Sequence, residues 1–305
     1  MSALADHLSD YLRLRRALGF ALGRHGHDLQ DFVAFLDAAD ADTITVDLAV
    51  AWARSKGSPK PITVDFRISA VRGFAHYMHA IDPDTEVPPP GLLSVPRRRP
   101  APHIYSPNEL TLLFDAVARL KPALRAATLS TMLGLIAATG MRVGEAIALT
   151  RLDFALVDGV ITIRHAKFDR MRLVPLHPTT TSALRRYALT RDHLCPEPRT
   201  DRFFLSSTGG PLTGSVVEQA FRGVTAAVGL REGTTGPRIH DLRHTFAVRT
   251  LIDWQRDGID ISTHLPLLST YLGHVEPKNT YWYLTAVPEL MQAAAARLEN
   301  DGTRP

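Results

Sequence analysis

Residues 157–176, VDGVITIRHAKFDRMRLVPL, decide the fold class, because this stretch departs from a helical pattern. Its two halves are rich in β-branched residues that alternate with other residue types. A short turn containing Lys167 and Asp169 separates them. Such a pattern is typical of a β-hairpin. Since the flanking segments have helical spacing, the sequence predicts a mainly α protein with a small antiparallel sheet (α+β).

Helical patterns lie on both sides of this hairpin. Ser106 and Pro107 have the residue types of a helix cap and a first helical position. Apolar residues then recur at helical spacing, and the predicted helices cover residues 123–139, 143–149, 179–189, 239–252, 264–272 and 288–300. Residues 106–305 are therefore predicted to form one mixed domain.

A proline-rich segment precedes that domain. Seven of the 21 prolines fall between Pro83 and Pro102, and such sequence resists both helix and sheet. Before it, apolar residues recur at three- and four-residue steps. We predict a helical domain over residues 1–94 and a linker over residues 95–105. The linker arginines Arg97, Arg98 and Arg99 could bind a phosphate backbone or simply keep the linker solvated.

Composition and charge restrict the class of protein. The chain has 305 residues, of which 45% are hydrophobic and 22% charged, so it can bury a core in two ordinary domains. Its net charge of +4 is compatible with a polyanionic partner. The single Cys195 excludes an intrachain disulfide and fits a reducing compartment. Without a signal-like or membrane-spanning segment, we expect a soluble intracellular protein.

The common cofactor motifs are missing from the sequence. It contains no GxxxxGK[ST], no GxGxxG after a strand, no HExxH and no paired CxxC, so we expect no cofactor and no metal. What remains is a series of cationic residues near helix ends. Arg142 lies between two apolar runs and can pair with Glu145. His240 and Arg243, three residues apart, share a helix face and can reach the same anion.

Four segments together resemble, in the right order, the signature boxes of the tyrosine recombinase or phage integrase family: GMRVGEAIAL, HAKFDRMRLVPL, HDLRHTFA and LGHVEPKNTYWY. The resemblance spans about Ser106 to Leu284. It implies a helical core-binding domain and a catalytic domain that together clamp duplex DNA. It also implies a DNA strand transferase that cleaves and rejoins DNA through a 3′-phosphotyrosyl intermediate, without ATP or metal.

The resemblance implies six catalytic residues: Arg142, Lys167, His240, Arg243, His274 and Tyr283. Tyr283 would be the nucleophile, since it follows His274 by nine residues, and Tyr281 is the nearby alternative. Glu145 and Asp241 are expected to orient the arginines.

The chemistry of phosphodiester cleavage accounts for these residue types. Arg142 and Arg243 would supply permanently charged donors to the nonbridging oxygens of the transition state. A phenol with a pKa near 10 needs a proton acceptor, for which we favour His240, while His274 would bind a phosphate oxygen. The ammonium of Lys167 suits the protonation of the leaving 5′ oxygen, which an arginine would perform poorly.

The expected partner is duplex DNA that carries a specific recombination site. The resemblance implies a homo-oligomer on DNA, a tetramer, in which the helix over 288–300 docks on a neighbouring protomer. Packing of this helix on its own domain is the alternative. Accessory or partner recombinases could take part. Two alternatives stay open: an enzyme of the type IB topoisomerase kind, which acts as a monomer, and a catalytically silent DNA-binding protein. We expect a cytoplasmic, nucleoid-associated protein encoded by a bacterium or a mobile element.

One segment departs from the compact pattern of the family. Arg243 and His274 are 31 residues apart, and we interpret DWQRDGIDIST, residues 253–263, as an insertion before the last boxes. A surface loop accommodates an insertion at low cost, so we predict a loop here.

Overall fold

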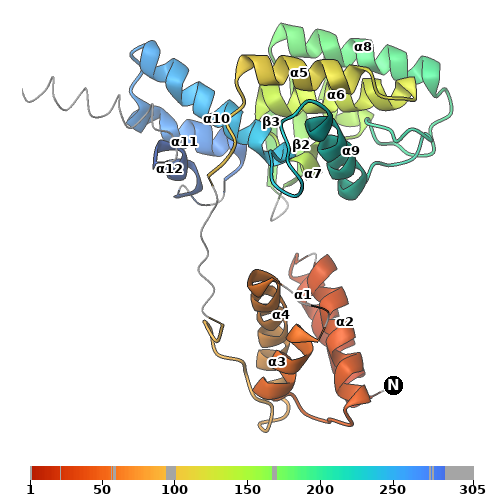
Figure 1. The fold of residues 1–305 in the computed structure, drawn as a ribbon, viewed down its shortest axis with the longest axis vertical. Coiled ribbons are helices and arrows are strands. Elements are labelled where there is room, and N and C mark those ends of the chain that lie inside the picture. The colour runs from red at the N-terminus through yellow and green to blue at the C-terminus, as the bar shows by residue number, and fades with distance from the viewer. Residues whose placement is uncertain are drawn as a thin grey trace, which may run out of the picture. The chain divides into compact units, whose positions relative to one another are not determined.

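The computed structural model of the chain describes residues 2–20, 22–55, 57, 60–93, 101–166, 170–274, 276 and 278–285 (Figure 1). The chain divides into two compact units, Met1–Pro100 and Ala101–Pro305. Three predicted features lie outside the described residues: the linker arginines Arg97, Arg98 and Arg99, the hairpin residue Lys167, and the segment 288–300. Within the described part, no helix is both long enough and apolar enough to span a membrane.

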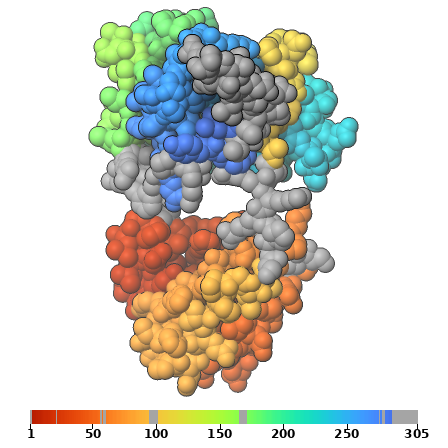
Figure 2. Space-filling model, turned by 90° about the vertical axis from the view of Figure 1, so that its left-hand side faces the viewer, coloured from red at the N-terminus to blue at the C-terminus, as the bar shows by residue number. Residues whose placement is uncertain are grey.

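The described residues of the first unit form the helices α1 (Ala3–Ala17), α2 (Gly23–Ala38), α3 (Val46–Arg54) and α4 (Pro61–His79). Phe32, Trp52 and Phe74 are almost completely buried at its centre. Val87 and Leu92, which follow α4, pack against the same core, and Figure 2 shows the unit as one closely packed body. The start of the proline-rich segment therefore belongs to this unit.

The second unit contains α5 (Pro107–Ala118), α6 (Ala123–Thr139), α7 (Val143–Ala148), α8 (Pro178–Leu194), α9 (Gly214–Ala227), α10 (Ile239–Arg256), α11 (Ile261–Leu272) and α12 (Lys278–Thr285). A short 3-10 helix covers Arg151–Asp153. The predicted start of α5 is confirmed, because Ser106 and Glu109 form a capping box there. Helix α6 packs against α5, α8 and α10, while α10, α11 and α12 gather at one end of the unit (Figure 1).

A three-stranded antiparallel sheet completes the second unit. Its strands β1 (Phe154–Ala155), β2 (Val160–Ala166) and β3 (Arg170–Pro175) lie in the order β1-β2-β3. The predicted hairpin is β2 and β3, with Ile161 opposite Val174, and β1 is a strand that the sequence analysis did not predict. Both of these paired residues are buried, whereas Leu173 is exposed, as the alternation along a strand requires. The predicted fold class is confirmed.

The prediction of a surface loop over residues 253–263 is wrong. Residues 253–256 form the last turn of α10, and residues 261–263 form the first turn of α11. Trp254 and Ile261 pack against the apolar cluster between these helices, so their burial continues the helical pattern. Only a short connection remains, and Asp260 caps α11 by accepting a hydrogen bond from the backbone of Ser262.

Candidate active site

Arg142 occupies the N-terminal cap of α7, where its side chain is held from two sides. Its Nη1 donates to Glu145 Oε1 at 2.9 Å, and its Nη2 donates to the carbonyl oxygen of Gly273 at 2.9 Å. The backbone N–H of Arg142 also donates to Glu145 Oε2. These hydrogen bonds fix the orientation of the guanidinium. Because 37% of the side chain is exposed, it can still contact a ligand.

Arg243, on α10, is only 1% exposed. Its Nη1 donates to the carbonyl oxygen of Gly140 at 2.7 Å, and its Nη2 donates to that of Leu272 at 2.9 Å. These carbonyls lie at the C-terminal ends of α6 and α11, where the helix dipoles favour a cation. Burial and the charge of Arg142 lower the pKa of Arg243 to about 10, so it stays charged at neutral pH.

Glu145 lies between two arginines. Besides Arg142 it binds Arg172 of β3, whose Nη1 and Nη2 donate to Oε1 and Oε2 at 2.9 and 2.8 Å. Burial alone would raise the pKa of Glu145, but the hydrogen bonds and charge of Arg172, together with Arg142, lower it to about 2. The carboxylate is therefore ionised at neutral pH, and the predicted contact between Glu145 and a site arginine is present.

The sequence analysis missed Arg172, although the strand pattern contains a signal for it. Arg172 and Val174 are two residues apart in β3, so they lie on the same face of the sheet. Val174 is buried, while Met171 and Leu173 are exposed. A charged residue on the buried face of a strand needs an ionic partner, and Glu145 is that partner.

His240 lies in the first turn of α10, three residues before Arg243. Protein atoms around the ring reduce its hydration and the charge of Arg243 is near, so its pKa falls to about 4 even though part of the residue is exposed. The ring is neutral at pH 7. It packs edge-on against His244, with 4.6 Å between the ring centroids.

Asp241 does not contact the arginines that it was predicted to orient. Its carboxylate accepts from the backbone N–H of Arg238 at 2.7 Å and from Arg238 Nη2 at 3.2 Å. Asp241 is the third residue of α10, and from that position a carboxylate reaches back to the cap of its own helix. Its observed role is to fix the start of the helix that carries His240 and Arg243.

Tyr283, on α12, is 2% exposed and packs in the cluster between α10 and α11. Its hydroxyl lies 3.1 Å from Nδ1 of His244, a residue that the sequence analysis missed. The signal for His244 is its spacing, since it follows His240 by one helical turn and shares its face.

His274 follows Gly273, and its Nδ1 lies 2.6 Å from Thr280 Oγ1 of α12. Tyr281 is 54% exposed.

The structure thus brings together five of the six predicted residues, and Lys167 lies outside the described residues. Two fixed arginines can bind the oxygens of a tetrahedral anion, and the phenol of Tyr283 and the neutral imidazole of His240 lie near them. In the described ranges, no group of three or more His, Cys, Asp or Glu side chains could hold a metal ion.

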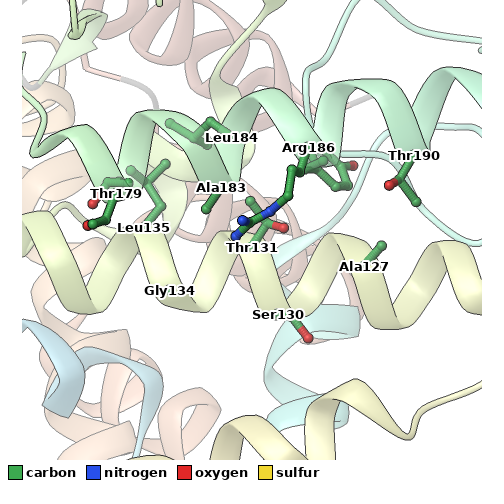
Figure 3. A pocket seen from close by; sticks show the side chains of 12 residues that line it. Ala127, Ser130, Thr131, Gly134, Leu135, Thr179, Ala183, Leu184, Arg186 and Thr190 are labelled. Carbon is green, nitrogen blue, oxygen red and sulfur yellow. The ribbon is translucent and has the colours of Figure 1, made fainter.

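The described part of the second unit also has hollows outside this cluster. A groove of about 560 Å³ runs between α6 and α8, lined by hydroxyls and by Arg186, which extends from α8 toward Thr131 of α6 (Figure 3). A second, apolar groove of about 340 Å³ lies between α10 and α11. It is lined by Phe246, Thr250, Trp254, Leu267, Leu268 and Tyr271.

Comparison with known proteins places this site in a family context. The sequence model of the protein family described as "Phage integrase family" matches residues 105–289 of the chain. The chain is 39% identical to the integrase/recombinase y4rB of Sinorhizobium fredii, over 98% of each chain. It is 31% identical to the tyrosine recombinase XerD of Caulobacter vibrioides, over 88% of this chain and 82% of that protein. A lambda integrase tetramer bound to a Holliday junction has a similar fold, with a TM-score of 0.58 and 17% identity over 90% of this chain and 78% of that one.

Proposed function

Because the chain belongs to the phage integrase family, we propose that the site around Arg142 and Arg243 is where it breaks and rejoins DNA. The protein is a tyrosine recombinase, an enzyme that cleaves and rejoins DNA at specific sites. The observation that carries the assignment of the site is the fixation of both guanidiniums by backbone carbonyls at the ends of α6 and α11. Rigid cations of this kind stabilise the charge of a transition state without reorganising.

In the proposed reaction, Arg142 and Arg243 bind the nonbridging oxygens of the scissile phosphate. The phenolic oxygen of Tyr283 attacks phosphorus in line, and the bond from phosphorus to the 5′ oxygen breaks. The product is a 3′-phosphotyrosyl bond and a free 5′ hydroxyl. Since the hydroxyl of Tyr283 is buried in this structure, α12 has to shift before the oxygen can reach a DNA phosphate.

Proton transfer accompanies both steps. Neutral His240 is the proposed acceptor of the phenolic proton, because its low pKa keeps a lone pair available. His274, which Thr280 orients, would donate to a phosphate oxygen. Lys167 is the proposed donor of the proton to the leaving 5′ oxygen. The 5′ hydroxyl of another DNA strand would then attack the phosphotyrosine, which reverses these steps and releases Tyr283.

The proposed partner is duplex DNA with a specific site. Residues 1–94 would bind the core of that site, and Arg97, Arg98 and Arg99 would contact its backbone. We propose that the enzyme is cytoplasmic and nucleoid-associated, and that a bacterium or a mobile element encodes it.

We further propose that the chain assembles on DNA as a homotetramer, with accessory or partner recombinases where a site requires them. The lambda integrase tetramer on a Holliday junction, which has the same fold, supports this. The segment 288–300, with Leu290, Met291 and Leu298 in one stripe, would dock in the apolar groove of a neighbouring protomer. Leu267 in that groove is 63% exposed, so its apolar side chain is open to contact with the apolar residues of the segment.

The experiment uses a nicked duplex that carries a site recovered by binding selection, so that cleavage traps the enzyme. We expect a covalent protein–DNA adduct without added metal or ATP. With two intact duplexes we expect recombinant products, formed by a multimer. Relaxation of supercoiled DNA by a monomer, without recombinants, would instead support the topoisomerase alternative. Tight binding without an adduct would support the catalytically silent alternative.

A further inference from the structure

We propose that Arg172 is a positioning residue for Arg142, and so for the phosphate that Arg142 binds. This inference rests on the proposed function of the site. The side chain of Arg142 is held by two acceptors, the Glu145 carboxylate and the carbonyl of Gly273. Arg172 contacts both of the structural elements that supply these acceptors, which makes it the link between them.

The first contact is the carboxylate itself. Arg172 holds both oxygens of Glu145 in a two-bond pair, whereas the side chain of Arg142 makes a single bond to Oε1. A paired guanidinium and carboxylate define each other's plane, so Arg172 fixes the orientation that Glu145 presents to Arg142. Only 12% of the Arg172 side chain and 8% of the Glu145 side chain is exposed, so solvent screens this pair weakly.

The second contact is the C-terminal end of α11. Nε of Arg172 donates to the carbonyl oxygen of Tyr271 at 3.1 Å, two residues before the Gly273 carbonyl that binds Arg142. Gly273 has a φ of 69°, and a Cβ there would lie 2.7 Å from Nη1 of Arg172. The guanidinium therefore packs directly on the turn that supplies the second acceptor.

Charge gives Arg172 a further effect on Arg142. Two guanidiniums share one carboxylate, so Glu145 neutralises one positive charge and leaves one. The three groups together therefore carry a net charge of +1, and Arg142 is the more exposed of the two arginines. Without Arg172, the pair of Arg142 and Glu145 would carry no net charge and would attract a phosphate less.

The test is Arg172→Gln, measured as single-turnover adduct formation on the selected nicked duplex. The matched control is Arg164→Gln, because Arg164 lies on the neighbouring strand β2 and pairs with Asp153, which is likewise a capping-box carboxylate. We expect Arg172→Gln to slow cleavage by about 100-fold, as misplacement of a catalytic group does, while the control stays within about 3-fold of wild type.

A second substrate separates positioning from general structural damage. It carries a methylphosphonate at the scissile position, where a methyl group replaces one nonbridging oxygen and removes the negative charge. If Arg172 acts by placing the charge of Arg142, the loss on this substrate falls to about 10-fold or less, because the transition state demands less charge stabilisation. Equal losses on both substrates, or no loss on either, would overturn the proposal.

Arg172→Lys covers the case in which Arg172→Gln does not fold. It keeps the charge but cannot form the two-bond pair, and we expect the same larger loss on the phosphodiester than on the methylphosphonate. Thermal melting and duplex binding of each variant establish that it is folded. A wild-type enzyme that forms no adduct contradicts the proposed function, whereas a wild-type adduct with unchanged Arg172 variants contradicts this inference alone.

Discussion

The hydroxyl of Tyr283 lies 3.1 Å from Nδ1 of His244, and both residues are buried. This contact joins α12 to α10, the helix that carries His240 and Arg243. The proposed nucleophile is thus attached to the helix proposed to bind the phosphate, through His244, which lies one turn beyond the predicted His240. Movement of Tyr283 toward DNA has to break or remake this hydrogen bond.

A double-mutant cycle measures this contact. His244→Phe and Tyr283→Phe keep the ring volumes and each remove one partner. We expect each to lower the free energy of unfolding by about 1–2 kcal/mol. We expect the double variant to be more stable than the sum of the two losses by about 1 kcal/mol, because both remove the same bond. Urea denaturation provides the values, and strictly additive losses would show that the contact contributes nothing.

The pKa of Glu145 predicts how stability depends on pH. Its value of about 2 in the folded chain lies below the ordinary 4.5, so the ion pair stabilises the fold above pH 4.5 and this contribution is lost as the pH falls toward 2. The shift corresponds to roughly 3 kcal/mol, an upper value for a buried pair. We expect Glu145→Gln to be less stable than wild type at pH 7 and to approach it at pH 2–3. Parallel stability curves for the two proteins would contradict the pair's role.

His240 makes a separate prediction about protonation. Its pKa of about 4 in the folded chain lies below the ordinary 6.5. As the pH falls from 6.5 to 4, the unfolded chain therefore binds the proton first, and His240 lowers the stability of the fold. In the folded enzyme the ring stays a proton acceptor throughout this range. Histidine NMR titration, with His240→Gln to assign the signal, measures the value directly. A titration midpoint near 6.5 would contradict the lowered pKa of His240 and its assignment as a neutral proton acceptor.

Gly140 tests how the helix end supports Arg243. It has a φ of 63°, and a Cβ there would lie 2.6 Å from Phe246 Cδ1 and 2.8 Å from Leu272 Cδ2. We expect Gly140→Ala to cost about 1–3 kcal/mol of stability and to slow cleavage, since its carbonyl binds Arg243. Gly144→Ala is the control, because Gly144 lies in α7 with open space around it. We expect that variant to be neutral or stabilised by up to about 1 kcal/mol. Equal effects in the two variants would contradict a special role for the turn at Gly140.

Local patterns in the sequence were sufficient for the fold class, and they named most of the residues that the structure brings together in the candidate site. The hairpin follows from alternation around residues 160–175, and Ser106 and Pro107 mark the start of α5. Arg142, His240, Arg243 and His274 were found because their segments resemble a family in order and spacing. Each of these motifs is contained within a few consecutive residues, and the order of the motifs along the chain completes the resemblance.

The errors have a common physical cause, because contacts between residues far apart in the chain cannot be predicted from local sequence patterns. Arg172 contacts the candidate site because β3 packs beside Glu145 and the end of α11. Asp241 was assigned to the arginines, but its own helix cap is the nearer partner. Most of residues 253–263, predicted as a loop, is helical, because Trp254 and Ile261 pack on an apolar surface that only the folded chain provides.

The measurement that tests the central claim most directly compares wild type, Tyr283→Phe and Tyr281→Phe on the nicked duplex, with the adduct resolved on a denaturing gel. Peptide mapping of the wild-type adduct identifies the attached residue. We predict an adduct on Tyr283 that is abolished in Tyr283→Phe and retained in Tyr281→Phe, whose side chain is exposed and outside the buried cluster. An adduct that survives Tyr283→Phe, or that maps to Tyr281, would contradict the assignment of Tyr283 as the nucleophile.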